Sequence, residues 1–268
     1  MKLNRYTKML FAGILIVAVL LLLKSNVTFS YEPKIGDDNL KNRALEINSD
    51  LVQSLYSKLT ILDDSLLTSN YKYAYFKMSS PEKELSTEEK LYIAIENMYT
   101  ANMLELKRED DIYKTRIKAE EVLDYAKRLF KDEGINPNTL NFEPSSNCGI
   151  VSYLYTGEHY ELGFKKCDIK EEVNKTELVS AKKEDNYVIL RLKSLYATYK
   201  EKTKKEKEGH YLLKNYNSED VINTVDESKI DEELEKTIKS DSVDEYDFYF
   251  ELRGEDYYLS KIRLLKKD

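Results

Sequence analysis

The cysteines and histidines are the side chains whose spacing most readily suggests chemistry. Cys148 and Cys167 are the only cysteines, His159 lies between them, and His210 follows. A cysteine nucleophile needs a base within hydrogen-bond reach. A hairpin predicted between the two cysteines places His159 beside its turn and the two cysteines opposite each other. We therefore expect a Cys148–Cys167 disulfide, which an even cysteine count also favours in an exported chain.

Acidic side chains are the second group of candidates. Asp241, Asp244, Glu245 and Asp247 could gather an ion, but no glycine marks a calcium loop, and a chain with 49 acidic residues forms such clusters by chance. Two carboxylates could hydrolyse a glycoside, although their separation in space cannot be read from sequence. Serine-hydrolase, zinc-peptidase and nucleotide-binding motifs are absent from the sequence. We therefore assign no catalytic, cofactor-binding or metal-ligating residue and expect no cofactor.

The stretch Met9 to Leu23 is entirely apolar and indicates that the chain is directed to a membrane. Three basic residues precede it and Lys24 follows, so the N-terminus is expected to stay inside and the rest to be exported. A helix of this length spans roughly 22 Å, less than a hydrocarbon core of about 30 Å. Two interpretations of residues 1–24 remain open: a single-pass membrane anchor, and a signal peptide cleaved near Ser30.

The charge of the exported part excludes one class of partner. Setting aside the four basic side chains of residues 1–24 leaves 38 basic and 49 acidic side chains, a net charge of −11. Phosphate neutralisation supplies most nucleic-acid affinity, so we expect no nucleic-acid partner. Membrane contact is expected only through the N-terminal segment, and a protein partner remains possible.

Residues 25–41 contain a proline, a glycine and several charges, which is typical of a tether. Apolar residues then recur at helical spacing from about Asn42 to Leu62. The tether and this first helix divide the chain into residues 1–24, 25–41 and an extracytoplasmic domain of residues 42–268.

Two further helices are predicted before residue 134. Ser86-Thr-Glu-Glu89 is a capping box, in which the serine oxygen accepts an early amide hydrogen bond of the helix that follows. The next apolar stripe ends at Phe130, with Gly134 as its C-terminal cap. The sequence therefore predicts a helical part over residues 42–134.

From residue 139 onward the apolar pattern has period two, which predicts a mainly β part over 139–268. A turn at Gly157-Glu158 makes the numbers of paired residues sum to 315 and sets Cys148 opposite Cys167. This register places six apolar side chains on one face: Val151, Tyr153, Tyr155, Tyr160, Leu162 and Phe164. Because a bridge is strained at a hydrogen-bonded pair, a bulge at Gly149 is a possible adjustment.

Two more hairpins and a short helix complete the pattern. Asp185-Asn186 suits a two-residue turn, and the pairing sets Val179 and Ala181 on the face of Val188, Leu190 and Leu192. Ile230, Leu234 and Ile238 indicate a short helix. The last hairpin, with a three-residue loop at Gly254–Asp256, sets two apolar rows opposite each other: Tyr246, Phe248, Phe250 and Leu252 against Tyr258, Ile262 and Leu264.

The predicted fold class is α+β: an N-terminal membrane or signal helix, a helical layer, and one antiparallel sheet built of hairpins. The expected function is that of a membrane-anchored or secreted extracytoplasmic domain that binds a protein or an envelope component without catalysis. The alternative is an extracytoplasmic cell-wall hydrolase whose carboxylates the sequence does not place. A deep pocket with two carboxylates of raised pKa would favour the hydrolase, and a shallow sheet face or an apolar groove would favour binding.

Overall fold

The structure is a computed structural model that describes residues 42–59, 75, 84–101, 103–136, 149–165, 172–201, 203, 207–215 and 218–266. Residues 40–268 form one compact unit, and residues 1–39 form another that lies outside the described residues. The expected membrane or signal segment and the tether therefore also lie outside them, as do Cys148 and Cys167. Within the described ranges, no helix is long and apolar enough to cross a membrane.

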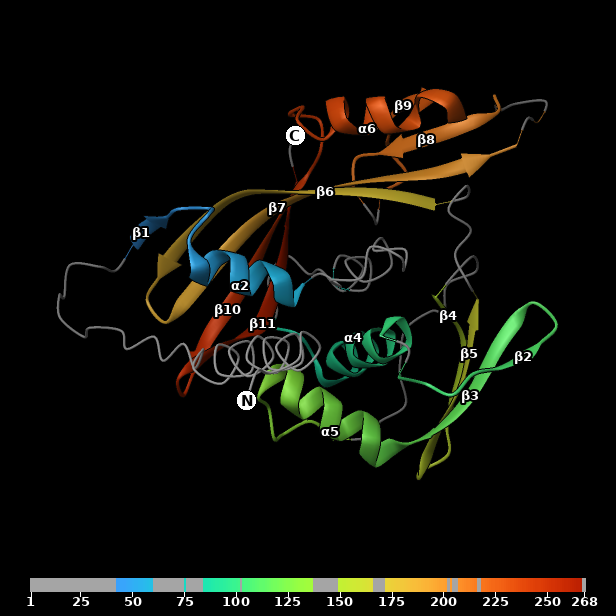
Figure 1. The fold of residues 1–268 in the computed structure, drawn as a ribbon, viewed down its shortest axis with the longest axis vertical. Coiled ribbons are helices and arrows are strands. Elements are labelled where there is room, and N and C mark those ends of the chain that lie inside the picture. Colours follow the sequence, from blue (N-terminus) through green and yellow to red (C-terminus); the bar gives the residue numbers. More distant parts are fainter. Residues whose placement is uncertain are drawn as a thin grey trace, which may run out of the picture. The chain divides into compact units, whose positions relative to one another are not determined.

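The described residues form helices and two antiparallel sheets, which confirms the α+β class and corrects the expectation of a single sheet (Figure 1). The large sheet has the order β1-β6-β7-β10-β11, with β8 and β9 joined to β7. Its strands are β1 (Asn42–Leu45), β6 (Glu172–Glu184), β7 (Tyr187–Lys200), β8 (Gly209–Leu213), β9 (Val221–Val225), β10 (Glu245–Arg253) and β11 (Asp256–Leu265).

Strand β7 is the branch point of the large sheet. On one edge it pairs with β6 along nearly its whole length. On the other edge, residues 187–193 pair with β10 and residues 196–200 pair with β8. The β8–β9 arm and the β10–β11 arm therefore share one strand, because the 14 residues of β7 are enough to pair with both.

The β6–β7 hairpin has the predicted two-residue turn. Glu184 pairs with Tyr187, and Asp185 has φ +51°, as such turns require. Ala181 lies opposite Leu190 as expected, but Val179 is a bulge residue and is exposed. Leu178 faces Leu192 in its place, because the extra residue shifts the register by one.

The last hairpin differs from the prediction at its tip. Arg253 pairs with Asp256, so the loop has two residues, Gly254 and Glu255, rather than three. Further from the loop, a register shift between Tyr249 and Phe250 adds one unpaired residue to β11, which compensates for the shorter loop. Phe248 consequently still lies opposite Ile262, so the prediction matched the far half of the hairpin and not its tip.

The small sheet has the order β2-β3-β5-β4 and contains the hairpin predicted with most detail. Its strands are β2 (Lys107–Glu109), β3 (Ile112–Lys118), β4 (Gly149–Tyr155) and β5 (His159–Lys165). Tyr153 pairs with Leu162 and Tyr155 with Tyr160, which confirms the register that sums to 315 and the turn at Gly157, whose φ is +91°.

A bulge between Ile150 and Ser152 changes the far end of that hairpin. Beyond it, Ile150 pairs with Phe164 and Gly149 with Lys165, so the residue numbers sum to 314. Ile150 is buried on the inner face, whereas Val151 is only partly buried. The bulge was expected at Gly149 and lies at Val151 instead. The register that set the cysteines opposite each other therefore does not extend to the last described pair.

The part over residues 42–134 is not all helical. Residues 42–45 form β1, and helix α2 begins only at Asp50 and ends at Lys58. Residues 107–118, within the part predicted to be helical, form the β2–β3 hairpin. The two predicted helices on either side of this hairpin are present. Helix α4 (Thr87–Thr100) precedes it and has the predicted capping box at Ser86, and helix α5 (Ala119–Phe130) follows it.

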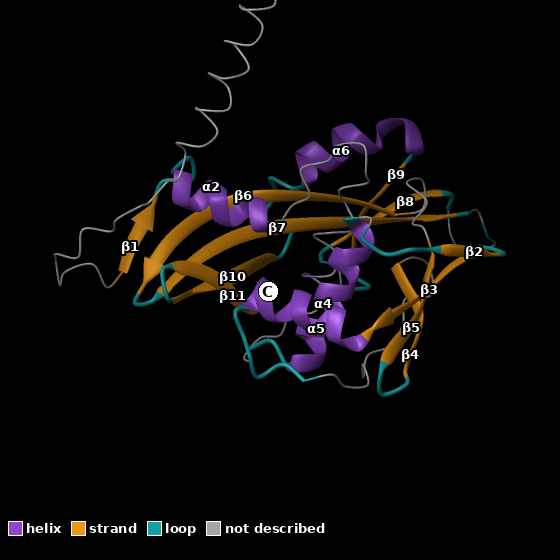
Figure 2. Cartoon of the chain, turned by 60° about the horizontal axis from the view of Figure 1, so that its bottom comes forward, coloured by secondary structure: helices purple, strands orange, loops and turns teal. Residues whose placement is uncertain are grey.

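Helix α4 lies between the two sheets (Figure 2). Its residues 90–98 are all buried, so both apolar and polar side chains of this helix contact protein. Asn97 donates a hydrogen bond to the Tyr75 hydroxyl, and Tyr75 packs on Phe248 of the large sheet. Tyr99 stacks on Phe164 of the small sheet at 4.2 Å between ring centroids. Helix α4 thereby connects the two sheets through one core.

The buried Glu96 makes a further connection to the small sheet. Its carboxylate accepts a hydrogen bond of 2.9 Å from the Ile150 amide, next to the β4 bulge. Burial, with Glu96 as its neighbour, raises the pKa of Tyr99 to about 12. Helix α4 therefore carries charged and amide groups into the core where the fold supplies partners for them.

The opposite face of the large sheet has a smaller core. Alternate β7 residues Leu195 and Ala197 pack with Leu212 under α6 (Ile230–Thr237), which follows the 3-10 turn η1 (Glu227–Lys229). Residues of the other parity, Leu190 and Leu192, belong to the main core with α2, α4 and α5. The predicted short helix is confirmed, and it covers the branched arm rather than the main core.

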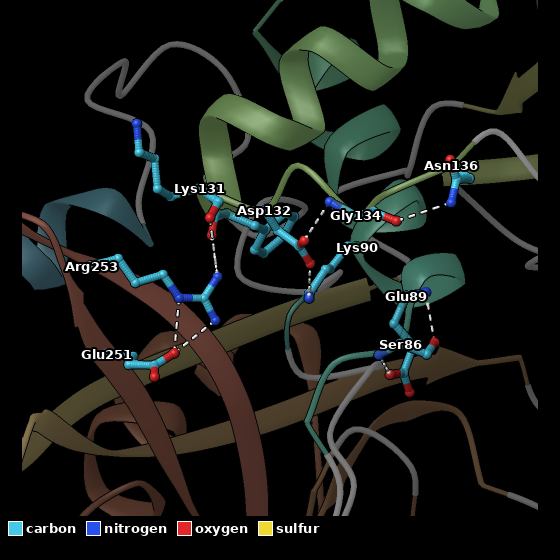
Figure 3. A network of polar contacts seen from close by, with 10 residues as sticks. Ser86, Glu89, Lys90, Lys131, Asp132, Gly134, Asn136, Glu251 and Arg253 are labelled. Carbon is cyan, nitrogen blue, oxygen red and sulfur yellow. Dashed lines mark hydrogen bonds and ion pairs between the residues drawn. The ribbon is translucent and has the colours of Figure 1, made fainter.

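Polar contacts fix the end of α5 against the large sheet (Figure 3). The Arg253 guanidinium donates to the Phe130 carbonyl at 2.7 Å and to Glu251 at 2.8 Å, and cations stabilise the negative end of a helix. Lys90 of α4 pairs with Asp132 at 2.7 Å. The left-handed residue that ends α5 is Lys131, with φ +48°, so the expected cap at Gly134 is wrong by three positions.

Candidate functional site

The small sheet has one covered and one uncovered face. In both Figure 1 and Figure 2, α4 and α5 lie on one side of it and no described element lies on the other. Side chains alternate along a strand, so the register defines the uncovered side. We call it the outer face; its strand positions are Lys107, Glu109, Ile112, Lys114, Arg116, Lys118, Ser152, Leu154, His159, Glu161, Gly163 and Lys165.

The outer face is hollowed. A concavity of about 540 Å³ is lined by residues of all four strands, among them Lys107, Lys114, Arg116, Ser152 and Leu154. Ser152 lies directly across from Gly163, and a Cβ at position 163 would overlap the serine hydroxyl oxygen. The glycine therefore permits the close approach of β4 and β5 at this pair, and the bulge in β4 lies directly beside it.

Charged side chains surround the hollow. Lys114 pairs with Glu109 at 2.5 Å, and Arg116 lies 3.6 Å from Glu161. The hydrogen bond that Lys114 donates to Glu109, together with the negative charge of Glu109, raises the pKa of Lys114, so the ammonium stays charged at neutral pH. Leu154, at 56% exposure, is the large apolar side chain of this face. The outer face therefore combines exposed charged side chains with the exposed apolar side chain of Leu154.

The acidic cluster suggested by the sequence is divided between two structural roles. Asp247 is fully buried and accepts hydrogen bonds of 2.8 and 3.0 Å from Arg191 and 2.8 Å from Arg263. Asp244 accepts a hydrogen bond of 2.7 Å from Asn215, just beyond β8. Among the described residues, no three histidine, cysteine or acidic side chains are placed to hold a metal ion.

Among the described residues, the carboxylates with shifted pKa values all have a lowered pKa. Burial would raise the pKa of Asp247, but the hydrogen bonds from Arg191 and Arg263 outweigh it and lower the pKa. The hydrogen bond from Lys90 lowers the pKa of Asp132, and that from Lys175 lowers the pKa of Glu235. These acids stay ionised at neutral pH, whereas a general acid would need a raised pKa.

The two histidines lie in different sheets. His159 is the first residue of β5, where its amide donates to the Thr156 hydroxyl beside the predicted turn. His210 is buried in β8, with its ring 5.2 Å from that of Tyr199. The cysteines lie outside the described residues, so the disulfide stays a prediction.

Sequence reasoning missed half of the candidate face because it did not identify the β2–β3 hairpin. The signal was present: Ile112, Lys114, Arg116 and Lys118 alternate with other residues, and Asp110 takes φ +55° in the turn. The consecutive charges at residues 108–111 also fit a break between two helices, with Ile117 in the later one, and this interpretation conceals the hairpin. Comparison with protein-family models, curated proteins and solved structures found no match.

Proposed function

We propose that this chain is an extracytoplasmic domain that binds a protein or another envelope component without catalysing a reaction. The N-terminal segment either anchors it in the cell membrane or is removed near Ser30. The outer face of the small sheet is the proposed binding surface. The observation that carries this proposal is the open, charged hollow on a sheet face that no described element covers.

Two further observations favour binding over hydrolysis. A glycosidase or peptidase built on carboxylates needs one of them protonated near neutral pH. In the described ranges, the three carboxylates with shifted pKa values are all shifted downward, and none of the three lines the hollow. The hollow is also an open concavity in a sheet rather than an enclosed pocket, which suits contact with a partner surface.

Photo-crosslinking in intact cells tests the proposal. A photoreactive amino acid replaces Leu154 on the outer face and, in a control chain, Val221 on β9, which is also exposed. We expect a discrete crosslinked adduct from position 154 and none from position 221. Equal crosslinking from both positions, or none from either, would refute the outer face as a binding surface.

A release assay tests the absence of catalysis. The full chain is incubated with isolated cell-envelope polymer, and soluble fragments are measured over time. We expect no release above that of buffer. Fragment release that disappears in a Glu161→Gln variant would show that the hollow is an active site and would contradict the proposal.

A further inference from the structure

The outer face has a charge opposite in sign to that of the rest of the exported chain. Counting Glu105 at the rim of the hollow, three acidic side chains face five basic ones, a net charge of +2. Residues 25–268 together have a net charge of −11. The basic side chains of the face are Lys107, Lys114, Arg116, Lys118 and Lys165.

The basic side chains are only partly neutralised within the face. Glu109 and Glu161 each lie beside one cation, at 2.5 and 3.6 Å. Lys107, Lys118 and Lys165 form no ion pair with any described residue. Lys107 lies directly opposite Lys114, and like charges at opposed positions repel. An anionic group placed between these lysines would relieve that repulsion.

The shape of the face distinguishes between anionic surfaces. A lipid bilayer is flat on this scale, whereas three of the cations here, Lys107, Lys114 and Arg116, line a hollow of about 540 Å³. A polypeptide segment can enter such a hollow, place carboxylates beside the lysines and contact Leu154 with an apolar side chain. We propose that the outer face binds an acidic segment of a partner polypeptide, an inference that rests on the proposed function and specifies its ligand.

The proposal determines how binding should respond to salt and to charge reversal. Complementary charges accelerate association and are screened once the salt concentration shortens the Debye length below about 10 Å. Binding should therefore weaken as salt is added. Reversing two unpaired lysines replaces attractions with repulsions, and we expect about tenfold weaker binding.

Fluorescence anisotropy of a labelled oligoglutamate peptide tests this with the full chain in detergent micelles. The face variant carries Lys107→Glu and Lys118→Glu, and both side chains are exposed, so folding should be retained. The control variant carries Lys229→Glu and Lys239→Glu, which make the same change in net charge at the ends of α6. We expect the peptide to bind the unsubstituted chain and the control equally and the face variant about tenfold more weakly.

Three results would overturn the inference. The peptide could fail to bind, or bind both variants equally. The face could bind vesicles of phosphatidylcholine with phosphatidylglycerol but not the peptide, which would assign it to lipid. Sedimentation could show a dimer that only the face variant loses, which would make a second copy the occupant.

The crosslinking at Leu154 separates this inference from the function on which it rests. An adduct at Leu154 that persists in the face variant would leave the binding function standing and remove its acidic ligand. Absence of any adduct at Leu154 would refute the binding function itself.

Discussion

Asp247→Asn removes the charge from the carboxylate that joins three strands of the large sheet. Asp247 of β10 lies opposite Arg191 of β7 and Arg263 of β11, and it is fully buried. It accepts three hydrogen bonds from the two guanidiniums, at 2.8, 3.0 and 2.8 Å. An asparagine has one oxygen to accept hydrogen bonds, and its amide group faces donors.

The structure sets the expected magnitude. Losing two charge-assisted hydrogen bonds at about 1.5 kcal/mol each gives a loss of roughly 3 kcal/mol, near the lower end for breaking a buried ion pair. The arginine side chains are 34% and 35% exposed, so water replaces part of the lost contact and keeps the loss near that end. For a domain of this size, this corresponds to a fall in Tm of roughly 6–12 °C.

Asp256→Asn is the matched control. Asp256 pairs with Lys58 at 3.1 Å, but the two side chains are 60% and 36% exposed. Exposed pairs contribute about 1 kcal/mol or less, so the same chemical change should cost little. Urea unfolding of the full chain, with the slope unchanged, measures both losses. Equal losses for the two variants would refute the view that burial of Asp247 makes its ion pairs strong.

The pH dependence supplies an independent check. The arginines hold the pKa of Asp247 below its unfolded value of about 3.9. Its contribution to stability is therefore present above that value and is lost as the pH falls through the folded-state pKa. The stability difference between the unsubstituted chain and Asp247→Asn should stay constant down to about pH 5 and narrow below it. A difference that widens in acid would contradict the assignment.

Three further predictions concern the hairpins and the place of the chain. Gly157→Val should cost about 2 kcal/mol because φ is +91° there, whereas Glu161→Lys should change stability by less than about 1 kcal/mol; thermal melts in the reverse order would refute the turn. A Cys148–Cys167 bridge should contribute roughly 3 kcal/mol, and mass spectrometry that finds two free thiols in the non-reduced protein would exclude it. Alkaline phosphatase fused after Asp268 should be active outside the cell, and activity of a cytoplasmic reporter alone at that site would contradict export.

Local signals in the sequence predicted the local features of the fold. The Ser86 capping box and the Asp185-Asn186 turn depend on adjacent residues, and both are present. The turn at Gly157 followed from the glycine together with two apolar rows, and it too is confirmed. These features succeed because a few neighbouring residues determine the backbone conformation.

The bulges could not be predicted in the same way. Val151 and Val179 are apolar, so they extend the alternating pattern and conceal the extra residue. At the last hairpin, the loop is one residue shorter than expected, and the register shift near Phe250 compensates for it. The pairs beyond the shift therefore match the prediction although the predicted loop is wrong. Beside the β4 bulge, the Ile150 amide donates to Glu96 of helix α4, a contact between residues 54 positions apart that a local pattern does not contain.

The spacing of apolar residues in the sequence also did not predict the two-sheet arrangement or the candidate face. Helix α4 is buried on all sides because it lies between the sheets, and its Glu96 and Asn97 find partners far away in sequence. An amphipathic stripe predicts one buried side only. The outer face combines the strands of residues 107–118 and 149–165, and only the folded register reveals that Ser152 lies opposite Gly163.

Labelling of single introduced cysteines in intact cells tests most directly that this chain binds a partner outside the membrane through the outer face. Leu154→Cys places a thiol on that face, and Val221→Cys places one on β9. A membrane-impermeant maleimide should label both in the purified full chain, above the parent chain. In intact cells we expect Val221→Cys to be labelled and Leu154→Cys to be protected by the bound partner. Equal labelling of both, or labelling of neither, would contradict it.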